Sequence, residues 1–230
     1  MVEEVYPQNL EQPALFKITD PTTGMVELFP AVWSALEDLI SPNVSVRHIA
    51  LDRLLELGAP RLTPLVVYTL ATRLTDPDLF LRCRIVQILG DVLSPDEQGG
   101  LPPASVSRCL NAYLIQMRIR SIYSLLEVAV QDAGLERHAG KLLSVCPYAG
   151  NHLASILSDR KLPIPIRQKA AQMIGIVGFL DAMSTLEHLE ERLEARLAGQ
   201  QAMPFAPPSI PSELELLPTI RSSLLLLHSL

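Results

Sequence analysis

The chain has 230 residues, of which 48% are hydrophobic, 19% charged and 5% aromatic. This length and hydrophobic share are enough for a substantial core, and they exclude a wholly disordered protein. The net charge of −6 argues against a nucleic-acid-binding protein, because nucleic-acid surfaces of proteins are normally basic.

The cysteines and the apolar runs indicate the compartment. Three cysteines without CxxC spacing do not make a disulfide framework. The first ten residues have no basic region of the kind that begins a secretory signal. No apolar run approaches the roughly 20 residues that cross a bilayer. We therefore expect a cytoplasmic protein without a membrane span.

Four segments follow one another along the chain. Residues 1–28 contain the turn-forming sequence DPTTG between two apolar stretches, and form either a small hairpin or an irregular arm. Residues 29–199 have helical periodicity almost throughout, and 200–211 contain four prolines, as an extended linker does. Residues 212–230 are rich in leucine, and form either a terminal helical cap, which we favour, or a helix that docks on a partner.

Three helices in 29–199 share an internal repeat. Around Arg82 and Arg167, apolar residues recur at offsets −1, +3, +6, +7 and +10, and Arg47 follows most of this pattern. A fainter copy surrounds Arg120, and successive arginines are then 35, 38 and 47 residues apart. Partner helices are expected at about 29–40, 60–74, 103–116, 135–158 with a break at Pro147, and 180–198. Such spacing is typical of stacked helical pairs.

The clearest copy, LTDPDLFLRCRIVQILGDVL at 74–93, is similar to the HEAT-repeat family, with looser copies at 40–58 and 157–178. The resemblance covers roughly residues 29–198. It implies an all-α fold, an armadillo-type α-α superhelix of about four to five helical pairs. Most members of the family are scaffolds that hold other proteins, and a few are enzymes, such as bilin lyases or DNA glycosylases.

The repeated arginines predict a structural ladder. Each arginine can reach an acid in its own turn or in a neighbouring turn and so join adjacent repeats. The alternative is a ladder that binds a partner. The residues concerned are Arg47, Arg82, Arg120 and Arg167, with Asp76, Asp78 and Asp159 as the turn acids.

A second set of positions predicts a protein-binding strip. Offsets +1, +5 and +9 from each repeat arginine lie beside the apolar stripe and should line up across stacked helices. They carry a formal charge of −3, which suits a basic or polar protein segment. The candidate residues are His48, Asp52, Glu56, Gln87, Asp91, Gln168 and Gln172, with Cys83 and Ile176 completing the set.

No catalytic signature, phosphate loop or complete metal-ligand set occurs in the sequence. We therefore expect a non-catalytic interaction scaffold or adaptor without a cofactor or metal, which binds another protein. An enzyme of the HEAT-like kind and a constitutive regulatory subunit of a larger complex remain as alternatives. The sequence does not specify the partner, the pathway or the oligomeric state.

Overall fold

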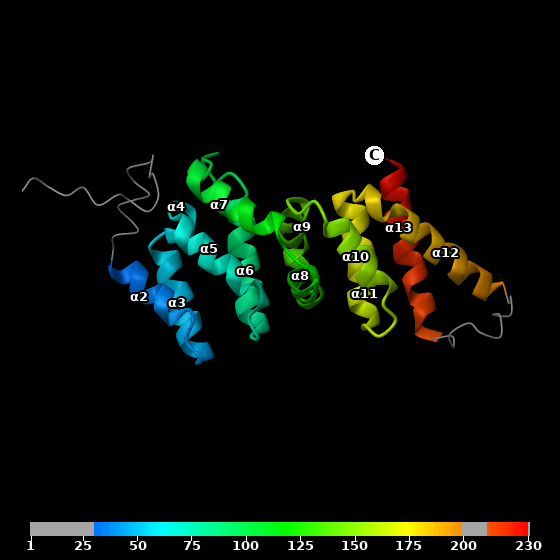
Figure 1. Ribbon diagram of the computed structural model, residues 1–230, viewed down its shortest axis with the longest axis horizontal. Helices are drawn as coiled ribbons and strands as arrows, with labels where there is room; N and C mark the ends of the chain where they lie inside the picture. The colour runs from blue at the N-terminus through cyan, green and yellow to red at the C-terminus, as the bar shows by residue number, and fades with distance from the viewer. Residues whose placement is uncertain (1–29, 199–210, 230) are drawn as a thin grey trace, which may run out of the picture.

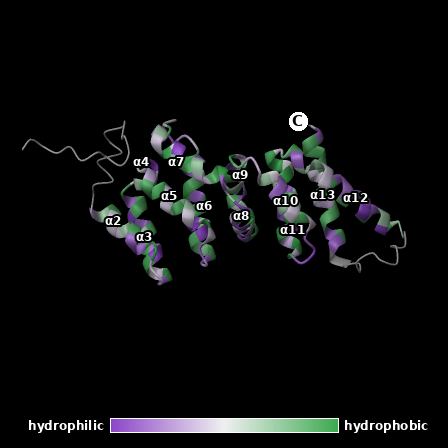
Figure 2. Cartoon of the chain, in the orientation of Figure 1, coloured by the Kyte–Doolittle hydropathy of each residue, from purple (hydrophilic) through white to green (hydrophobic). Residues whose placement is uncertain are grey.

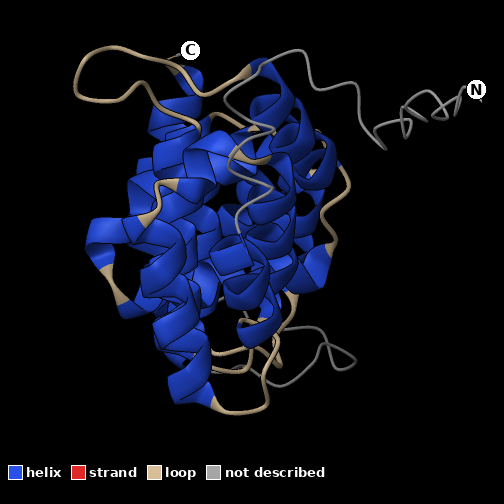
Figure 3. Ribbon diagram, turned by 90° about the vertical axis from the view of Figure 1, so that its left-hand side faces the viewer, coloured by secondary structure: helices blue, strands red, loops and turns tan. Residues whose placement is uncertain are grey.

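The computed structural model describes residues 30–198 and 211–229, which form an all-α structure with no strand among them (Figures 1 and 3). The arm expected at 1–28 and the linker expected at 200–211, apart from Pro211, lie outside this part of the chain. The α-helices are α2 (Pro30–Asp38), α3 (Val44–Glu56), α4 (Ala59–Leu62), α5 (Pro64–Thr72), α6 (Leu79–Val92), α7 (Ala104–Ile115), α8 (Ile119–Gln131), α9 (Glu136–Ser144), α10 (Ala149–Ser158), α11 (Ile164–Val177), α12 (Met183–Leu197) and α13 (Leu217–His228). Short 3₁₀ turns are η1 (Arg73–Thr75), η2 (Ala133–Leu135), η3 (Leu180–Ala182) and η4 (Pro211–Leu216).

The helices expected between the repeat arginines are present. The ranges 29–40, 103–116 and 180–198 contain α2, α7 and α12, and the range 60–74 contains α5 with most of α4. The segment 135–158 divides into α9 and α10 on either side of Pro147. Residues 212–230 contain most of η4 and all of α13, and α13 packs against α11 and α12.

Side chains in the turns fix where several helices begin. Asn43, Thr63 and Asp78 each accept a backbone N–H from the first turn of the helix that follows, at 2.7–3.1 Å. These contacts satisfy donors that have no partner within the helix. Gly178 ends α11 in the left-handed conformation, with φ of 87°, which an L side chain rarely adopts.

Five described helices, α3, α6, α9, α11 and α13, succeed one another as parallel neighbours and are called the parallel row below (Figure 1). Their direction follows from contacts in which the residue number rises together on both helices. These contacts are His48 with Asp78 and Asp52 with Arg84; His138 with Asp91 and Lys141 with Ser94; Glu136 with Lys169 and Gly140 with Val177; and Arg167 with Glu213 and Gly175 with Ser223.

The helix that carries Arg120 does not belong to this row. Arg82, near the start of α6, contacts Ser124 and Glu127 around the middle of α8. Cys146, just after α9, contacts the carbonyl oxygen of Met117, just before α8, so α8 runs antiparallel to α9 and hence to α6. Both α8 and α9 pack against α6 and α11, but of the two it is α9 that runs in the direction of the row, while α8 also packs against α10. The faint fourth copy of the repeat was therefore a wrong assignment. Its equivalent position in space is held by α9, where a glutamate replaces the arginine. The same offsets counted from Glu136 fall on five buried apolar residues, Leu135, Ala139, Leu142, Leu143 and Cys146.

The core follows the apolar stripe of the clear copies. Around Arg82, all five stripe residues from Leu81 to Val92 are buried, and around Arg167 only Val177 of the five is half-exposed. Around Arg120, by contrast, Ile119 and Val130 are exposed. Helices therefore alternate apolar and polar patches along their length rather than being apolar all round (Figure 2). Among the described helices, none has the length and apolar character required to cross a membrane.

The two glycines that coincide in the repeat are points of close helix packing. A Cβ atom on Gly175 would lie 2.7 Å from Ser223 Cα in α13, and one on Gly90 would lie 2.7 Å from the Cβ of His138 in α9. Ser223 also donates a hydrogen bond of 2.8 Å to the carbonyl of Ala171. Only a residue without a side chain allows α11 and α13 to approach this closely.

Replacing Gly175 by alanine should therefore destabilise the protein, by about 1–3 kcal/mol, because the backbone of α13 must move. Gly140, in α9, is a matched control, since its added Cβ would meet nothing closer than Val177 Cγ2 at 3.6 Å. Gly140→Ala should leave stability unchanged or raise it by up to about 1 kcal/mol, because alanine favours the helix. Urea unfolding of both variants is the measurement, and an equal effect would contradict the close contact.

Candidate protein-binding surface

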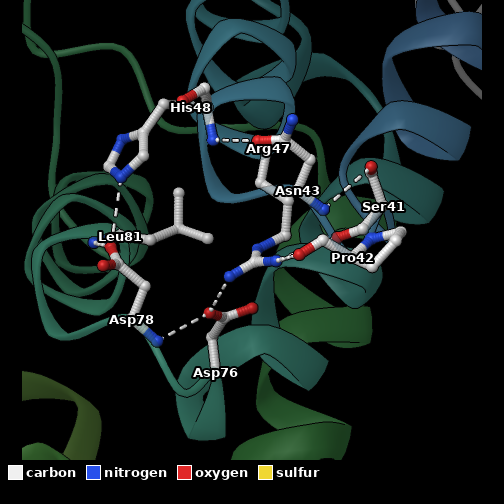
Figure 4. Close-up of polar contacts among 9 residues, drawn as sticks. Ser41, Pro42, Asn43, Arg47, His48, Asp76, Asp78 and Leu81 are labelled. Atoms are coloured by element: carbon white, nitrogen blue, oxygen red, sulfur yellow. Dashed lines mark hydrogen bonds and ion pairs between the residues drawn. The ribbon is translucent and has the colours of Figure 1, made fainter.

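Arg47 is the first of three buried arginines that join neighbouring helices of the parallel row. Its side chain is 6% exposed and donates to Asp76 Oδ1 at 3.0 Å and to the backbone carbonyl oxygens of Ser41 and Pro42 (Figure 4). Asp76 belongs to the turn that precedes the next parallel helix, α6. The guanidinium of α3 thus fixes the start of α6, in the manner expected from the sequence.

Arg82 makes the corresponding connection one helix further along. Its Nη1 donates to Ser124 Oγ at 2.9 Å and to Glu127 Oε2 at 2.6 Å, both on α8. The acceptors therefore lie within a helix and not in a turn. Nothing in the sequence pattern indicates these two acceptors.

Arg167 is completely buried, and its partner is an acid that the sequence analysis did not identify. It donates to the carbonyl of Leu157 at 2.8 Å and to Glu213 Oε1 at 2.9 Å, and the Glu213 side chain is also fully buried. Glu213 precedes α13 as Asp76 precedes α6, so an acid just before the next parallel helix was the signal that could have found it.

Three residues expected in the ladder take other positions. Arg120 is exposed, and within the described chain it makes no hydrogen bond or ion pair. Asp159 is also exposed and accepts the backbone N–H of Lys161, so it does not reach Arg167. Asp78 caps α6 and pairs with His48, at 3.1 Å, and no arginine lies within ion-pair distance of it. The ladder therefore consists of Arg47, Arg82 and Arg167.

Asp78 is held ionised by its neighbours. Burial alone would raise the pKa of its carboxyl group, but the N–H of Leu81, the hydrogen bond and charge of His48 and the charge of Arg47 outweigh it. The pKa of Asp78 is consequently lowered from 3.8.

The candidate strip forms polar contacts between the helices of the parallel row, beginning at α3 and α6. Asp52 pairs with Arg84 in a half-exposed contact, and a second nitrogen of Arg84 lies 3.4 Å from His48 Nδ1. Glu56 and Gln87 are exposed, and their side chains make no hydrogen bond or ion pair with another described residue. Part of the strip thus bridges helices and part faces solvent.

The strip continues over α9 and α11. Asp91 pairs with His138 Nε2 at 3.1 Å, and Glu136 binds both Lys169 and Gln172, the latter at 3.0 Å. Gln168 donates to the backbone carbonyl of Glu215 at 3.1 Å, which extends the contacts to η4. Since α9 separates α6 from α11, the strip includes two residues that the sequence did not place in it, Glu136 and His138.

The charge of the strip differs from the sequence expectation. The −3 of Asp52, Glu56 and Asp91 lies among the cations Arg84 and Lys169 and the imidazole of His138. The surface is therefore mixed in charge, with the acids half-exposed at its edge. A polar hollow of about 290 Å³ opens on it, lined by Val130, Pro165, Gln168, Lys169, Gln172 and Thr219.

A larger hollow of about 470 Å³ lies away from the strip. Tyr68 of α5 and Tyr113 of α7 meet there edge to face, with ring centroids 6.1 Å apart, and Met117 and Arg118 line its far side. Burial raises the pKa of Tyr113 above 10.0, so its hydroxyl remains protonated at neutral pH. Within residues 30–198 and 211–229, no cluster of His, Cys, Asp or Glu has the three members needed to hold a metal ion.

Searches of protein-family models, of curated proteins and of solved structures return no significant match to this chain.

Removal of the Arg82 side chain should destabilise the protein. Arg82→Ala leaves Glu127 and the hydroxyl of Ser124 without their buried partner, and we expect a loss of about 2–3 kcal/mol. Arg120→Ala is the matched control and should change stability by less than about 0.5 kcal/mol, because the side chain is exposed. Chemical denaturation of both variants tests this, and equal losses would show that Arg82 has no bridging role.

Glu213 should make stability depend on acid pH. Burial raises the pKa of its carboxyl group, but hydrogen bonds from Arg167 and Arg196 and the charges of Arg192 and Arg160 outweigh burial and hold the pKa below 4.5. A lowered folded-state pKa stabilises the protein above the unfolded-state pKa, and this contribution is lost as the pH falls through the folded-state value.

The stability difference between the native protein and Glu213→Gln should accordingly be constant above about pH 5 and shrink below pH 4.5. At neutral pH we expect it to be about 3–5 kcal/mol, the cost of breaking a buried ion pair. Urea unfolding between pH 3 and pH 7 measures it. A difference that grows on acidification would contradict the assignment.

Proposed function

We propose that this chain is a non-catalytic scaffold of the HEAT-repeat kind, which binds another protein along the exposed side of its parallel row. The helices would stack as an α-α superhelix of the pairs α2/α3, α5/α6, α8/α9, α10/α11 and α12/α13. Support comes from the repeat arginines of α3, α6 and α11, each of which bonds to an acid within a later pair, either on its first helix or between its two helices.

The observation that carries the binding proposal is the continuity of the polar strip. Its side chains succeed one another from α3 over α6 and α9 to α11, and each neighbouring pair is connected by at least one polar contact. A surface that is fixed in this way is preorganised, so a partner would not have to bear the entropy of ordering it. The exposed acids at its edge favour a segment with basic or polar side chains.

The first test of the proposal is to capture partners from source cells on immobilised protein and to identify them by mass spectrometry. The second test reverses the charge of two acids in the strip and measures the binding of the captured partner. Asp52→Lys with Asp91→Lys should weaken the captured partner at least tenfold, chiefly through a slower association at low salt. Both acids are more than half exposed, so each substitution should alter stability by less than about 1 kcal/mol.

Glu97→Lys with Glu191→Lys is the matched control, because both residues are exposed, lie outside the strip and change the net charge equally. This control should bind as the native protein does. A partner that is unaffected by the strip variant, but lost when the exposed leucines Leu225 and Leu226 are replaced by serine, would instead assign binding to α13.

A further inference from the structure

Four arginines converge on one carboxylate at the C-terminal end of the molecule. Arg167 lies on α11, Arg160 in the turn before it, and Arg192 and Arg196 on α12. Glu213 Oε1 lies 2.9 Å from Arg167 Nη2, 3.0 Å from Arg192 Nη2 and 3.4 Å from Arg160 Nε, and Oε2 lies 2.7 Å from Arg196 Nη1. We call these four arginines with Glu213 the arginine socket.

The socket has far more positive than negative charge. Glu213 is the one described acid within ion-pair distance of any of the four guanidinium groups, which leaves three positive charges without a counterion. The segment 199–210, which connects α12 to η4, contains no aspartate or glutamate in its sequence. The bridges of Arg47 to Asp76 and of Arg82 to Glu127 use one arginine per carboxylate, so joining helices does not require four.

Two guanidinium nitrogens of the socket are buried donors without an acceptor in the described structure. They are Nη1 of Arg167, whose side chain is completely buried, and Nη1 of Arg160. Buried donors of this kind are rare, because each unmade hydrogen bond costs stability. An additional acceptor at this position would satisfy them.

The electrostatics of Arg192 agree with a shortage of negative charge. Burial lowers the pKa of its guanidinium group, and the charges of Arg160, Arg196 and Arg167 lower it further, against the attraction of Glu213. The pKa of Arg192 therefore falls below the ordinary value of an arginine, although its guanidinium group touches a carboxylate.

The socket is also accessible from solvent. The side chain of Arg192 is 40% exposed, and those of Arg160 and Arg196 are each 20% exposed, while Arg167 and Glu213 form the closed floor. The outer three arginines are therefore partly open to solvent.

We propose that the arginine socket binds a small oxyanion of the phosphate type with two or more negative charges. Planar guanidinium forks match the oxygens of a phosphoryl group and are the side chains that most often bind it in pairs. Two charges on the ligand would reduce the excess from three to one. This site lies on α11 and α12, apart from the polar strip, and does not depend on protein binding there.

The test is titration calorimetry with inorganic phosphate, and with glycerol 3-phosphate as a phosphate monoester, with ionic strength held constant by sodium chloride. Inorganic phosphate at tenfold over its Kd should raise the melting temperature of the native protein by about 3–5 °C. A monoester that binds as tightly indicates the phosphoryl end of a larger molecule as the ligand, and weaker binding of the monoester indicates the free ion.

Arg192→Gln and Arg160→Gln should each weaken phosphate binding at least tenfold. Arg221→Gln is the matched control, because Arg221 is exposed on α13 and pairs with Glu190 and Glu194 outside the socket. Without phosphate, Arg192→Gln should melt no lower than the native protein, since it removes a surplus charge. Phosphate binding that is absent from the native protein, or that Arg221→Gln weakens as much as Arg192→Gln does, would overturn the proposal.

Discussion

Burial of a guanidinium group is the constraint on which the order of these helices depends. An arginine carries five N–H donors and a permanent charge, so it can be enclosed only where acceptors are brought to it. Arg47, Arg82 and Arg167 are each at most 7% exposed, and each finds its charged acceptor outside its own helix, in α8 or in the turn that precedes the next parallel helix. Misplacing either partner would strand a buried charge, and this penalty selects one stacking of the helices over others of similar apolar burial.

Close packing of helix backbones is the second feature that selects this stacking of the helices. Gly90 and Gly175 stand eight residues after their arginines, and each admits a neighbouring helix that any side chain would keep away. The arginine thus anchors the first turn of its helix to a neighbouring segment, and the glycine brings the last turn of the same helix close to the next parallel helix. Contacts at both ends of a helix restrict its distance and angle to its neighbours, which apolar stripes alone leave loose.

The sequence predicted those parts of the structure that depend on local pattern. The apolar stripe, the helix breaks at prolines and the capping residues before α3 and α6 are all encoded within a few residues, so helix positions followed directly. Partners across space were not encoded in this way. Arg120 has a similar local pattern to Arg82 and yet is exposed, because α8 runs in the opposite direction. The parallel position is filled by α9, whose apolar stripe follows the same offsets but is centred on Glu136, so a pattern anchored on arginine does not reveal it. Missing information on spatial partners also explains why the strip was expected to be simply acidic. Arg84 and Lys169 carry the compensating positive charge, and nothing in their spacing along the sequence marks them as partners of Asp52 and Glu136.

The two polar regions of the surface follow from opposite ways of balancing charge. Along the strip, each acid that bridges two helices of the parallel row has a cation or an imidazole beside it, so its field is short-ranged and suits recognition by shape and by many weak contacts. At the arginine socket the charges are concentrated and unequal, with a buried floor that solvent screens poorly. A field of that kind acts on a single ion rather than on an extended surface. If both proposals hold, the chain separates two tasks that one charged patch could not perform together, since an anion strong enough to satisfy four arginines would also neutralise a surface that attracts a basic partner.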